Sequence, residues 1–467
     1  MKISSLRMVN YRCFHDLTVT LHAGAGDEPG FTFLVAKNGV GKTTILSALS
    51  VALGSALLRL ADLTPPDLSQ RDARAEIVRS AAPPGGQAVV RREPNHPVRL
   101  VADGALLGET MRWARELRYK DSTHSTIKEA TPLAEKLAAT VARARAGEAV
   151  NLPVLAYFRT NRLWVRAPDD QDAEPAGPDS RFAAWRGCLD AGASWEETAK
   201  WWRRETVISR QKARPSLDAV RRVAGALGGG PDQPWFDLEL NDVVAHLDGH
   251  LRQFSDLSDG QRAMMGLLAD IARRAADLNP HLGADAPALT PGVVLIDEID
   301  MHLHPAWQRQ IVDLLRAQFP KMQFIVGTHA PQVLTDARSG EIRILRQRDG
   351  EQPEVLPLDI PPGMTADEVL TGPWYGLSTT TDDDTVGLIR EQAELMRLTD
   401  PTPAQITRQE EITAALRKRL GGWNDTSEER IVRSILAEIE EEQPAFTQED
   451  RARLKDLVLA RLRSQTT

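Results

Sequence analysis

A short loop near the N-terminus could bind the phosphates of a nucleotide. Gly39-Val-Gly41-Lys42-Thr43 fits the second half of the pattern G-x-x-x-x-G-K-[ST], with Ala36 where the pattern has its first glycine. Small residues let backbone N–H groups surround a phosphate, the lysine reaches the β- and γ-phosphates, and the threonine hydroxyl can ligate Mg²⁺. A chance loop between a strand and a helix is the alternative. We predict ATP and Mg²⁺ as cofactors, bound by a set of loop residues: Asn38, Gly39, Gly41, Lys42, Thr43 and Thr44.

Two carboxylates follow a second apolar stretch. Residues 293–296 are Val-Val-Leu-Ile, which predicts a parallel strand buried on both faces, and Asp297 and Glu298 come directly after it. Ligands bind at this end of the strands in open α/β sheets. We therefore predict that Asp297 holds the metal ion together with Thr43. Glu298 is then the catalytic base that deprotonates the attacking water.

A histidine ends the next predicted strand. Residues 321–327 lead into Thr328 and His329, and an imidazole at this position can reach a γ-phosphate and respond to the nucleotide state. We predict His329 as a second catalytic residue. The spacing of Asp300, His302 and His304 also allows a metal site, a less favoured alternative because the nucleotide motifs already explain this stretch.

The segment Leu257-Ser258-Asp259-Gly260-Gln261 stands before a predicted helix over 263–278. A serine hydroxyl, a glycine N–H and a helix N-terminus suit a γ-phosphate. The segment resembles the Leu-Ser-Gly-Gly-Gln signature of the ABC ATPase family, with Asp259 in place of the first glycine. In that family the signature of one head closes over the phosphate loop of another, so the resemblance implies ATP-dependent dimers in which Ser258, Gly260 and Gln261 bind nucleotide. A plain helix cap is the alternative.

The remaining pattern predicts the elements that position these residues. Residues 2–21 alternate as a β-hairpin, 31–36 and 152–158 form buried strands, and 110–120 form a helix. The order of the motifs resembles SMC-, RecF- and OLD-like ABC-type heads of the AAA family. This implies an α/β fold with a phosphate-loop parallel sheet and an N-terminal antiparallel β lobe, and places Arg12 near the nucleotide. A surface turn arginine is the alternative for Arg12.

Composition suggests several domains. The chain has 467 residues, of which 42% are hydrophobic and 26% charged. We expect the ATPase head at 1–165 and 241–360, a helical insert rich in Trp and Arg at 166–240, and a helical tail at 361–467. The insert residues Trp185, Trp195, Trp201 and Trp202, with the arginines between them, either bind single-stranded nucleic acid or form a helical core. Apolar residues at helical spacing in the tail predict helices over 385–398, 403–420, 428–442 and 448–464.

Charge and cysteine content favour a cytoplasmic protein. A net charge of −8 argues against a general nucleic-acid coat, and no apolar run is long enough to span a membrane. Cys13 and Cys188 lie far apart and outside any metal-type spacing, which favours two reduced thiols.

A more specific resemblance rests on the 152–158 strand, the compact insert and Gly372-Pro-Trp-Tyr-Gly-Leu-Ser378. These are similar to the PtuA family of the Septu and retron-associated anti-phage systems. The resemblance implies a homodimer or higher oligomer of heads, an HNH-type nuclease effector on the C-terminal helices, and DNA or retron RNA/msDNA as a further partner, with no membrane. A RecF-like DNA repair clamp and a slow nucleotide-sensing scaffold for protein or RNA remain alternatives, and a transport ATPase is the least favoured.

Overall fold

A computed structural model provides the structure, and the chain divides into two units that are described separately. The first comprises Met1–Val369 and Pro373–Tyr375, and the second comprises Leu370–Gly372 and Gly376–Thr467. The structure describes the following residues: 1–22, 24, 30–37, 39–61, 63–79, 90–160, 180–190, 195–226, 233–247, 249–347, 351–361, 363–377, 379–398 and 402–420.

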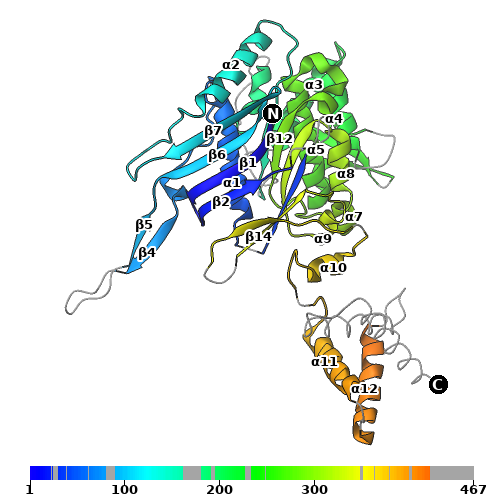
Figure 1. The fold of residues 1–467 in the computed structure, drawn as a ribbon. Helices are drawn as coiled ribbons and strands as arrows, with labels where there is room; N and C mark the ends of the chain where they lie inside the picture. The colour runs from blue at the N-terminus through cyan, green and yellow to red at the C-terminus, as the bar shows by residue number, and fades with distance from the viewer. Residues whose placement is uncertain are drawn as a thin grey trace. The chain divides into compact units, whose positions relative to one another are not determined.

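A six-stranded sheet forms the centre of the first unit (Figure 1). Its order is β15-β14-β3-β13-β12-β8, and all neighbours are parallel except β14 and β15. Every residue of β3, β8, β12 and β13 is buried, as expected for parallel strands covered on both faces. The strands are β3 (Phe31–Ala36), β8 (Val154–Phe158), β12 (Gly292–Ile296), β13 (Met322–Thr328), β14 (Ile342–Arg346) and β15 (Glu354–Pro357).

A second, antiparallel sheet contains the predicted N-terminal hairpin. Its order is β2-β1-β6-β7, with β1 (Lys2–Tyr11), β2 (Phe14–Thr20), β6 (Val98–Leu106) and β7 (Glu109–Leu117). The predicted helix over 110–120 is wrong, because β7 pairs with β6 along its whole length. Residues that favour helices in isolation, such as Ala114 and Arg115, are held in a strand by this pairing, since tertiary context overrides local preference. The α/β class, with a parallel and an antiparallel sheet, is confirmed.

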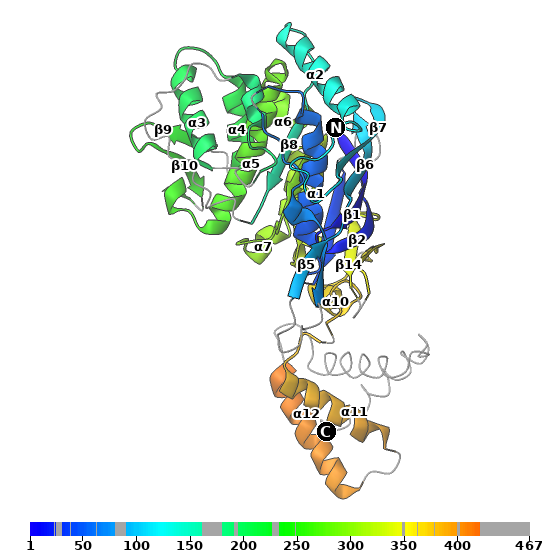
Figure 2. The same cartoon turned by 90° about the vertical axis from the view of Figure 1, so that its left-hand side faces the viewer.

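Helix α1 (Lys42–Gly54) joins the two sheets. It contacts β6 and β7 of the antiparallel sheet and β3, β12 and β13 of the parallel sheet. Figure 2 shows it between β1 and β6 on one side and β8 and α5 on the other. The Trp113 indole N–H on β7 donates to the Ala52 carbonyl of α1 at 2.8 Å. The helix that follows the phosphate loop therefore packs between the two sheets.

The region predicted as a helical insert is a mixed subdomain. It holds η3 (Arg181–Trp185), α3 (Trp195–Ser209) and α4 (Pro215–Gly225), and it continues into a small sheet of order β11-β10-β9 and the long helix α5 (Asp259–Leu278). The strands of the small sheet are β9 (Trp235–Asp237), β10 (Asp242–Leu247) and β11 (His250–Gln253). Trp185, Trp201 and Trp202 are buried, and Trp195 stacks on Phe254 with ring centroids 3.6 Å apart. The tryptophans therefore form a core, which favours that alternative over base stacking.

The other elements of the first unit are shorter or lie at its periphery. Strands β4 (Ala75–Arg79) and β5 (Val90–Pro94) pair with each other. The helices are η1 (Ser55–Leu57), η2 (Gln70–Asp72), α2 (Thr131–Arg145), η4 (Phe254–Asp256), η5 (Pro280–Asp285), α6 (Ala286–Leu289), α7 (Pro305–Gln308), α8 (Ile311–Gln318) and α9 (Pro331–Leu334), followed by α10 (Ala366–Thr371), which crosses into the second unit.

The second unit contains a helical pair. Helices α11 (Asp383–Arg397) and α12 (Pro403–Leu420) form where the sequence predicted them, and the Gln392 amide donates to the Thr413 hydroxyl at 2.9 Å. The predicted helices over 428–442 and 448–464 lie outside the described residues. Within the part of the chain that the structure describes, no helix is both long and apolar enough to cross a bilayer.

Candidate nucleotide-binding site

The carboxyl ends of three neighbouring strands bring the predicted residues together. Strands β3, β13 and β12 lie side by side, and their registers align Thr328 with Val35 and Ile296 with Val326. The phosphate loop follows β3, His329 follows β13, and the pair Asp297 and Glu298 follows β12. The site therefore forms at one edge of the sheet, where ligands bind in this class of fold.

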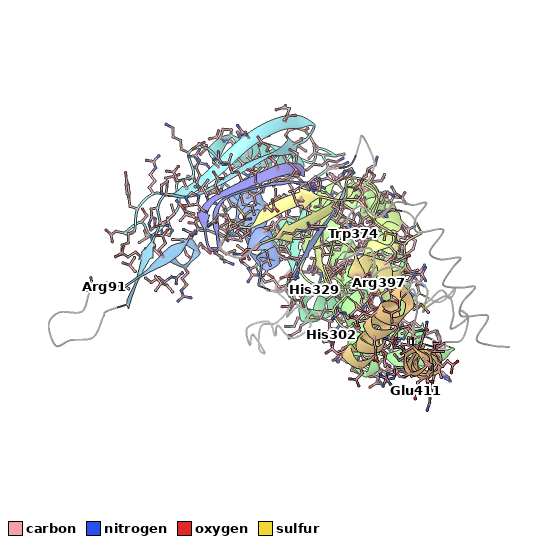
Figure 3. The ribbon with its side chains drawn as sticks, turned by 60° about the horizontal axis from the view of Figure 1, so that its bottom comes forward. Arg91, His302, His329, Trp374, Arg397 and Glu411 are labelled. Atoms are coloured by element: carbon pink, nitrogen blue, oxygen red, sulfur yellow. The ribbon has the colours of Figure 1, made fainter. Side chains whose placement is uncertain are left out.

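The Lys42 ammonium is buried at the carboxyl ends of these strands. Its Nζ donates to the Ala36 carbonyl at 3.2 Å and lies 2.5 Å from Nε2 of His329, and the residue is only 7% exposed. Burial lowers the pKa of Lys42, although the carboxylates of Asp297 and Glu298 oppose this. Figure 3 labels His329 on the ribbon. Burial and then the Lys42 charge lower the pKa of His329, which favours a neutral imidazole. A phosphate is a stronger partner for an ammonium than either neutral group.

Two oxygen ligands converge beside the lysine. The Thr43 hydroxyl donates to Oδ2 of Asp297 at 2.8 Å, and Asp297 is buried. Hydroxyl and carboxylate oxygens are the hard donors that Mg²⁺ prefers, usually with phosphate oxygens and water completing the shell. The Thr43–Asp297 pair therefore fits this ion, and these two residues would hold it.

The alternative metal site at residues 300–304 is not supported. Within the described residues, no group of three or more His, Cys, Asp or Glu is placed to hold a metal. Asp300 instead accepts from the Thr328 hydroxyl at 2.6 Å, and Nδ1 of His304 accepts from the Ala306 N–H at 3.3 Å. These side chains fix backbone turns.

The Glu298 backbone lies in the left-handed region, with φ of +48°. A residue with a Cβ holds this conformation only where its surroundings fix it, and such positions cluster at functional sites. Here Asp297 donates its N–H to the Phe158 carbonyl at 2.8 Å and Ile299 donates to the Gly327 carbonyl at 3.0 Å. The turn that carries Glu298 is thus held from both neighbouring strands, whereas its role as a catalytic base stays a prediction.

The sequence analysis considered Asp300 only as a possible metal ligand, and it did not single out Gly327 at all. Asp300 also accepts from the His329 N–H at 3.3 Å, so it holds the turn that carries the histidine. Gly327 leaves room for the metal-binding carboxylate, because a Cβ there would lie 3.2 Å from Oδ1 of Asp297. A glycine inside an apolar strand was the available signal, since it often marks a close approach.

The N-terminal bend packs against the phosphate loop. Gly41 has φ of +122°, and a Cβ there would lie 2.5 Å from Cζ of Phe14 and 3.1 Å from Sγ of Cys13. Arg12 lies in this bend, and its Nε donates to Oδ1 of Asp72 at 2.8 Å. The bend thus brings Arg12 near the loop, but its contact with nucleotide stays a prediction. The same holds for Gly39 and Thr44, and Asn38 lies outside the described residues.

The signature residues form a helix cap in the single chain. The Gln261 N–H donates to the Ser258 hydroxyl at 3.3 Å, and Oε1 of Gln261 accepts from the Ser258 N–H at 3.0 Å, which is a capping box on α5. A Cβ at Gly260 would lie 2.3 Å from the His302 carbonyl, so the backbone of the same chain requires a glycine there. Binding to the phosphate of a second chain stays a prediction for all three residues.

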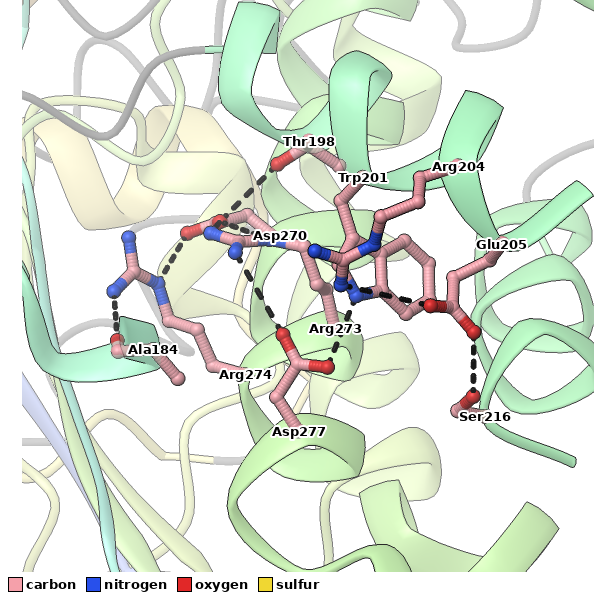
Figure 4. A network of polar contacts seen from close by, with 10 residues as sticks. All are labelled: Ala184, Thr198, Trp201, Arg204, Glu205, Ser216, Asp270, Arg273, Arg274 and Asp277. Atoms are coloured by element: carbon pink, nitrogen blue, oxygen red, sulfur yellow. Dashed lines mark hydrogen bonds and ion pairs between the residues drawn. The ribbon is translucent and has the colours of Figure 1, made fainter. Parts of the chain in front are cut away.

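A buried ionic cluster ties the helix that begins at the signature to the subdomain beside it (Figure 4). Asp270 of α5 accepts from Arg273 at 2.6 Å, Arg274 at 2.7 Å and the Thr198 hydroxyl of α3 at 3.2 Å. Arg274 also donates to the Ala184 carbonyl. Burial by itself would raise the pKa of Asp270, but the arginines outweigh it and lower the pKa to about 2. Opposite charges thus pair within α5, and hydrogen bonds from this cluster to the Thr198 hydroxyl and the Ala184 carbonyl hold α3 and η3 against it.

Two family models match the chain. One, described as "AAA domain", matches residues 5–165, and the other, described as "AAA domain, putative AbiEii toxin, Type IV TA system", matches residues 199–335. The two segments include the phosphate loop and the signature, carboxylate and histidine motifs. A crystal structure of an SMC head bound to the C-terminal winged-helix domain of ScpA is 16% identical, covers 77% of this chain and 99% of that chain, and gives a TM-score of 0.47.

Curated relatives match over shorter segments. The "Retron Vc95 probable ATPase" of Vibrio cholerae serotype O1 biovar El Tor is 44% identical over 28% of this chain and 25% of its own length. The "Septu protein PtuA" of Bacillus mycoides (strain KBAB4) is 35% identical over 28% of this chain and 18% of its own length. The chain thus spans a quarter or less of the length of the curated relatives it matches. Over these segments the chain matches AAA-domain models and is related to the retron ATPases and to PtuA.

Proposed function

We propose that the chain binds and hydrolyses ATP in a Mg²⁺-dependent reaction as the ATPase of an anti-phage defence system. The observation that carries this proposal is the meeting of the lysine, the hydroxyl–carboxylate pair and the histidine at one sheet edge, where Lys42 lies 2.5 Å from His329 and Thr43 lies 2.8 Å from Asp297. The names of the retron and Septu relatives support the defence role.

The chain's own residues suggest how the reaction proceeds. Lys42 exchanges its contact with neutral His329 for the β- and γ-phosphates, which frees the imidazole to meet the γ-phosphate. Glu298 accepts the proton of the attacking water from its fixed turn. Thr43 and Asp297 would hold a Mg²⁺ ion, which would supply charge neutralisation at the phosphate oxygens.

We also propose how two heads assemble and what their closure controls. Two heads close in the presence of ATP, and Ser258 and Gly260 of one head meet the γ-phosphate bound by the other. The helix N-terminus at Ser258 supports this, because its free N–H groups and dipole favour an anion. The C-terminal region then binds a separate effector, an HNH-type nuclease in our proposal, and head closure controls it.

The direct test uses the full chain with ATP and Mg²⁺. Lys42→Ala should weaken ATP binding by about 100-fold, because the buried cation that faces the phosphates is lost. Lys200→Ala is the matched control, since that lysine is exposed and pairs with Glu196 at 3.2 Å on α3. Equal ATP affinity in both variants would contradict the proposed site.

Dimer formation and effector binding are measured separately. Native mass of Glu298→Gln with ATP and Mg²⁺ should show an ATP-stabilised dimer or larger assembly, because binding continues while hydrolysis stops. Co-expression with the adjoining gene should retain its product in that assembly. A monomer that ATP does not change would contradict the shared site and leave Ser258 as a helix cap only.

A further inference from the structure

Arg12 stands in the tight bend between β1 and β2, and this bend packs against the phosphate loop. A Cβ at Gly41 would lie 2.5 Å from Cζ of Phe14 and 3.1 Å from Sγ of Cys13, the two residues that follow Arg12. Arg12 and Asn10 both have a left-handed backbone, with φ of +49° and +50°. Residues with a Cβ keep this conformation only where their surroundings hold it. Something must therefore fix the bend beside the loop.

The end of η2 supplies this support through the backbone. The Arg12 N–H donates to the Asp72 carbonyl at 2.7 Å, and the Arg74 N–H donates to the Asn10 carbonyl at 2.8 Å. The residues between these two bonds form an antiparallel bridge. The three residues of the bend that end at Arg12 are thus paired with the three residues that begin at Asp72.

Asp72 also fixes the Arg12 side chain. The Arg12 Nε donates to Oδ1 of Asp72 at 2.8 Å, and Cζ of Arg12 lies 5.3 Å from the centroid of the buried Tyr11 ring. The carboxylate is itself held, because its Oδ2 accepts from the N–H and the hydroxyl of Ser69, each at 2.9 Å. The Asp72 side chain is 8% exposed, whereas that of Arg12 is 41% exposed. A buried carboxylate thus anchors one edge of a guanidinium that reaches solvent.

The other edge of this guanidinium is available to a ligand. Among the described residues, the two Nη groups of Arg12 have no hydrogen-bond partner. The neighbouring Arg7 on β1 differs, since its Nε and Nη2 both donate to Asp16, at 2.9 Å and 2.6 Å. Terminal N–H groups of an arginine suit phosphate oxygens, and a side chain that is already fixed loses less entropy when it binds.

We infer that Asp72 is a positioning residue of the ATP site, which holds Arg12 so that its Nη groups meet a phosphate of the bound nucleotide. The inference rests on the proposed function, because it requires that the loop at Gly41 and Lys42 binds the phosphates. Arg12 is then a second cation of the site beside Lys42. Asp72 does not touch the nucleotide, and its whole effect on binding passes through Arg12.

The test is a double-mutant cycle on ATP affinity, measured by calorimetric titration of the full chain with Mg²⁺ in the Glu298→Gln background. Arg12→Ala should raise the Kd for ATP by about 20-fold, the size expected for the loss of a charged hydrogen bond. Asp72→Ala should raise it by about tenfold. Because Asp72 acts through Arg12, adding Asp72→Ala to Arg12→Ala should raise the Kd by less than about twofold more.

Three further variants separate positioning from folding. Asp72→Asn keeps an oxygen that can accept from the Arg12 Nε, so its Kd should stay within about threefold of the parent. Ser69→Ala removes a hydroxyl that donates to the same carboxylate, and Asp16→Ala removes the partner of Arg7 on the same hairpin. Both controls should leave the Kd within about twofold, whatever they cost in thermal stability.

If Asp72→Ala does not fold, Arg12→Lys serves as the second test. The lysine keeps the charge but has no Nε for the carboxylate to anchor, so the Kd should rise by about fivefold or more. An unchanged Kd in Arg12→Lys would overturn the inference.

The outcomes distinguish the inference from the proposed function. If Lys42→Ala binds ATP as tightly as the parent, the proposed function fails and the inference fails with it. If Lys42→Ala weakens binding but Arg12→Ala does not, the inference alone is overturned. It is also overturned if Asp72→Ala raises the Kd equally with and without Arg12, because Asp72 would then only support the fold.

Discussion

Two regions of this chain bury charged side chains, and the partners of the buried charge differ between them. Around Asp270, two guanidiniums and a hydroxyl surround one carboxylate, and the arginines lower its pKa to about 2. At the sheet edge, the Lys42 ammonium contacts a carbonyl and an imidazole, and burial lowers its pKa. The first region stabilises its charge with partners from its own chain. The second holds a cation whose direct contacts are a carbonyl and an imidazole, with the carboxylates of Asp297 and Glu298 nearby.

The difference indicates where a ligand is expected. Groups of the same chain that neutralise a buried charge hold the fold together. Removing one of them leaves the other charged groups buried without a partner, which destabilises the protein. A buried ammonium whose hydrogen-bond contacts are a carbonyl and an imidazole can form a stronger, charge-assisted hydrogen bond with an incoming anion. The same contrast is consistent with a structural role for the Asp270 cluster and with the proposed nucleotide site at Lys42.

The largest effect should come from the predicted base. Glu298→Gln should lower ATP turnover by about 10³-fold, because the amide cannot accept the proton of water. The free energy of unfolding should stay nearly unchanged. Phosphate release measures turnover, and thermal unfolding checks the fold. Asp313→Asn on α8, an exposed carboxylate, is the control and should leave turnover unchanged. Normal turnover in Glu298→Gln would remove Glu298 from the mechanism.

Asp270→Asn should produce the complementary result. Loss of the carboxylate leaves Arg274 buried without its counter-charge and Arg273 with only the more distant Asp277 at 3.9 Å, so the free energy of unfolding should fall by about 3 kcal/mol. Asp277→Asn, two turns further along α5, is the matched control. Burial raises the pKa of Asp277, so a neutral side chain is better tolerated there and the loss should stay below about 1 kcal/mol. Chemical denaturation measures both, and equal losses would contradict the comparison.

The same cluster predicts a dependence on pH. The pKa of Asp270 is lowered from 3.8 to about 2, so its contribution is complete above about pH 4 and is lost as the pH falls toward 2. This contribution amounts to about 2 kcal/mol, from about 1.4 kcal/mol per pKa unit. The stability difference between the unsubstituted chain and Asp270→Asn should therefore shrink between pH 4 and pH 2. A constant difference over that range would contradict the assignment.

A smaller effect should follow from crowding the metal-binding carboxylate. Gly327→Ala places a methyl 3.2 Å from Oδ1 of Asp297, which should destabilise the site by about 1–2 kcal/mol and raise the Mg²⁺ concentration needed for turnover. Gly266→Ala on α5 is the control, because the nearest atom of Trp195 would lie 3.5 Å away, an ordinary contact. That substitution should stabilise the helix slightly. A Mg²⁺ titration of turnover distinguishes the two variants.

The smallest effect concerns the signature serine. Ser258→Ala removes the hydroxyl that caps α5 and should lower the free energy of unfolding by about 1 kcal/mol, whereas Ser258→Thr keeps a capping oxygen. If Ser258 also meets the phosphate of a second chain, Ser258→Ala should in addition weaken the ATP-dependent dimer in native mass measurements. Loss of stability with an unchanged dimer would limit Ser258 to the cap.

Sequence alone was sufficient for the elements with strong local signals. The continuous apolar runs predicted β3, β12 and β13, and the motif residues at their ends were predicted to meet because parallel strands share one carboxyl edge. Helices α11 and α12 followed from helical periodicity in the same way. These features depend on neighbours in sequence, which a pattern records directly.

Other features were decided by tertiary structure. Glu109–Leu117 became a strand because β6 offers its edge, and the tryptophans of the 166–240 region became a core because α5 and its arginines fold against them. The support of His329 by Asp300 and the space that Gly327 leaves for Asp297 join residues that are far apart in sequence. Motif spacing determined which groups could react, whereas only packing decided which of them are neutralised by their own chain and which remain available to a nucleotide.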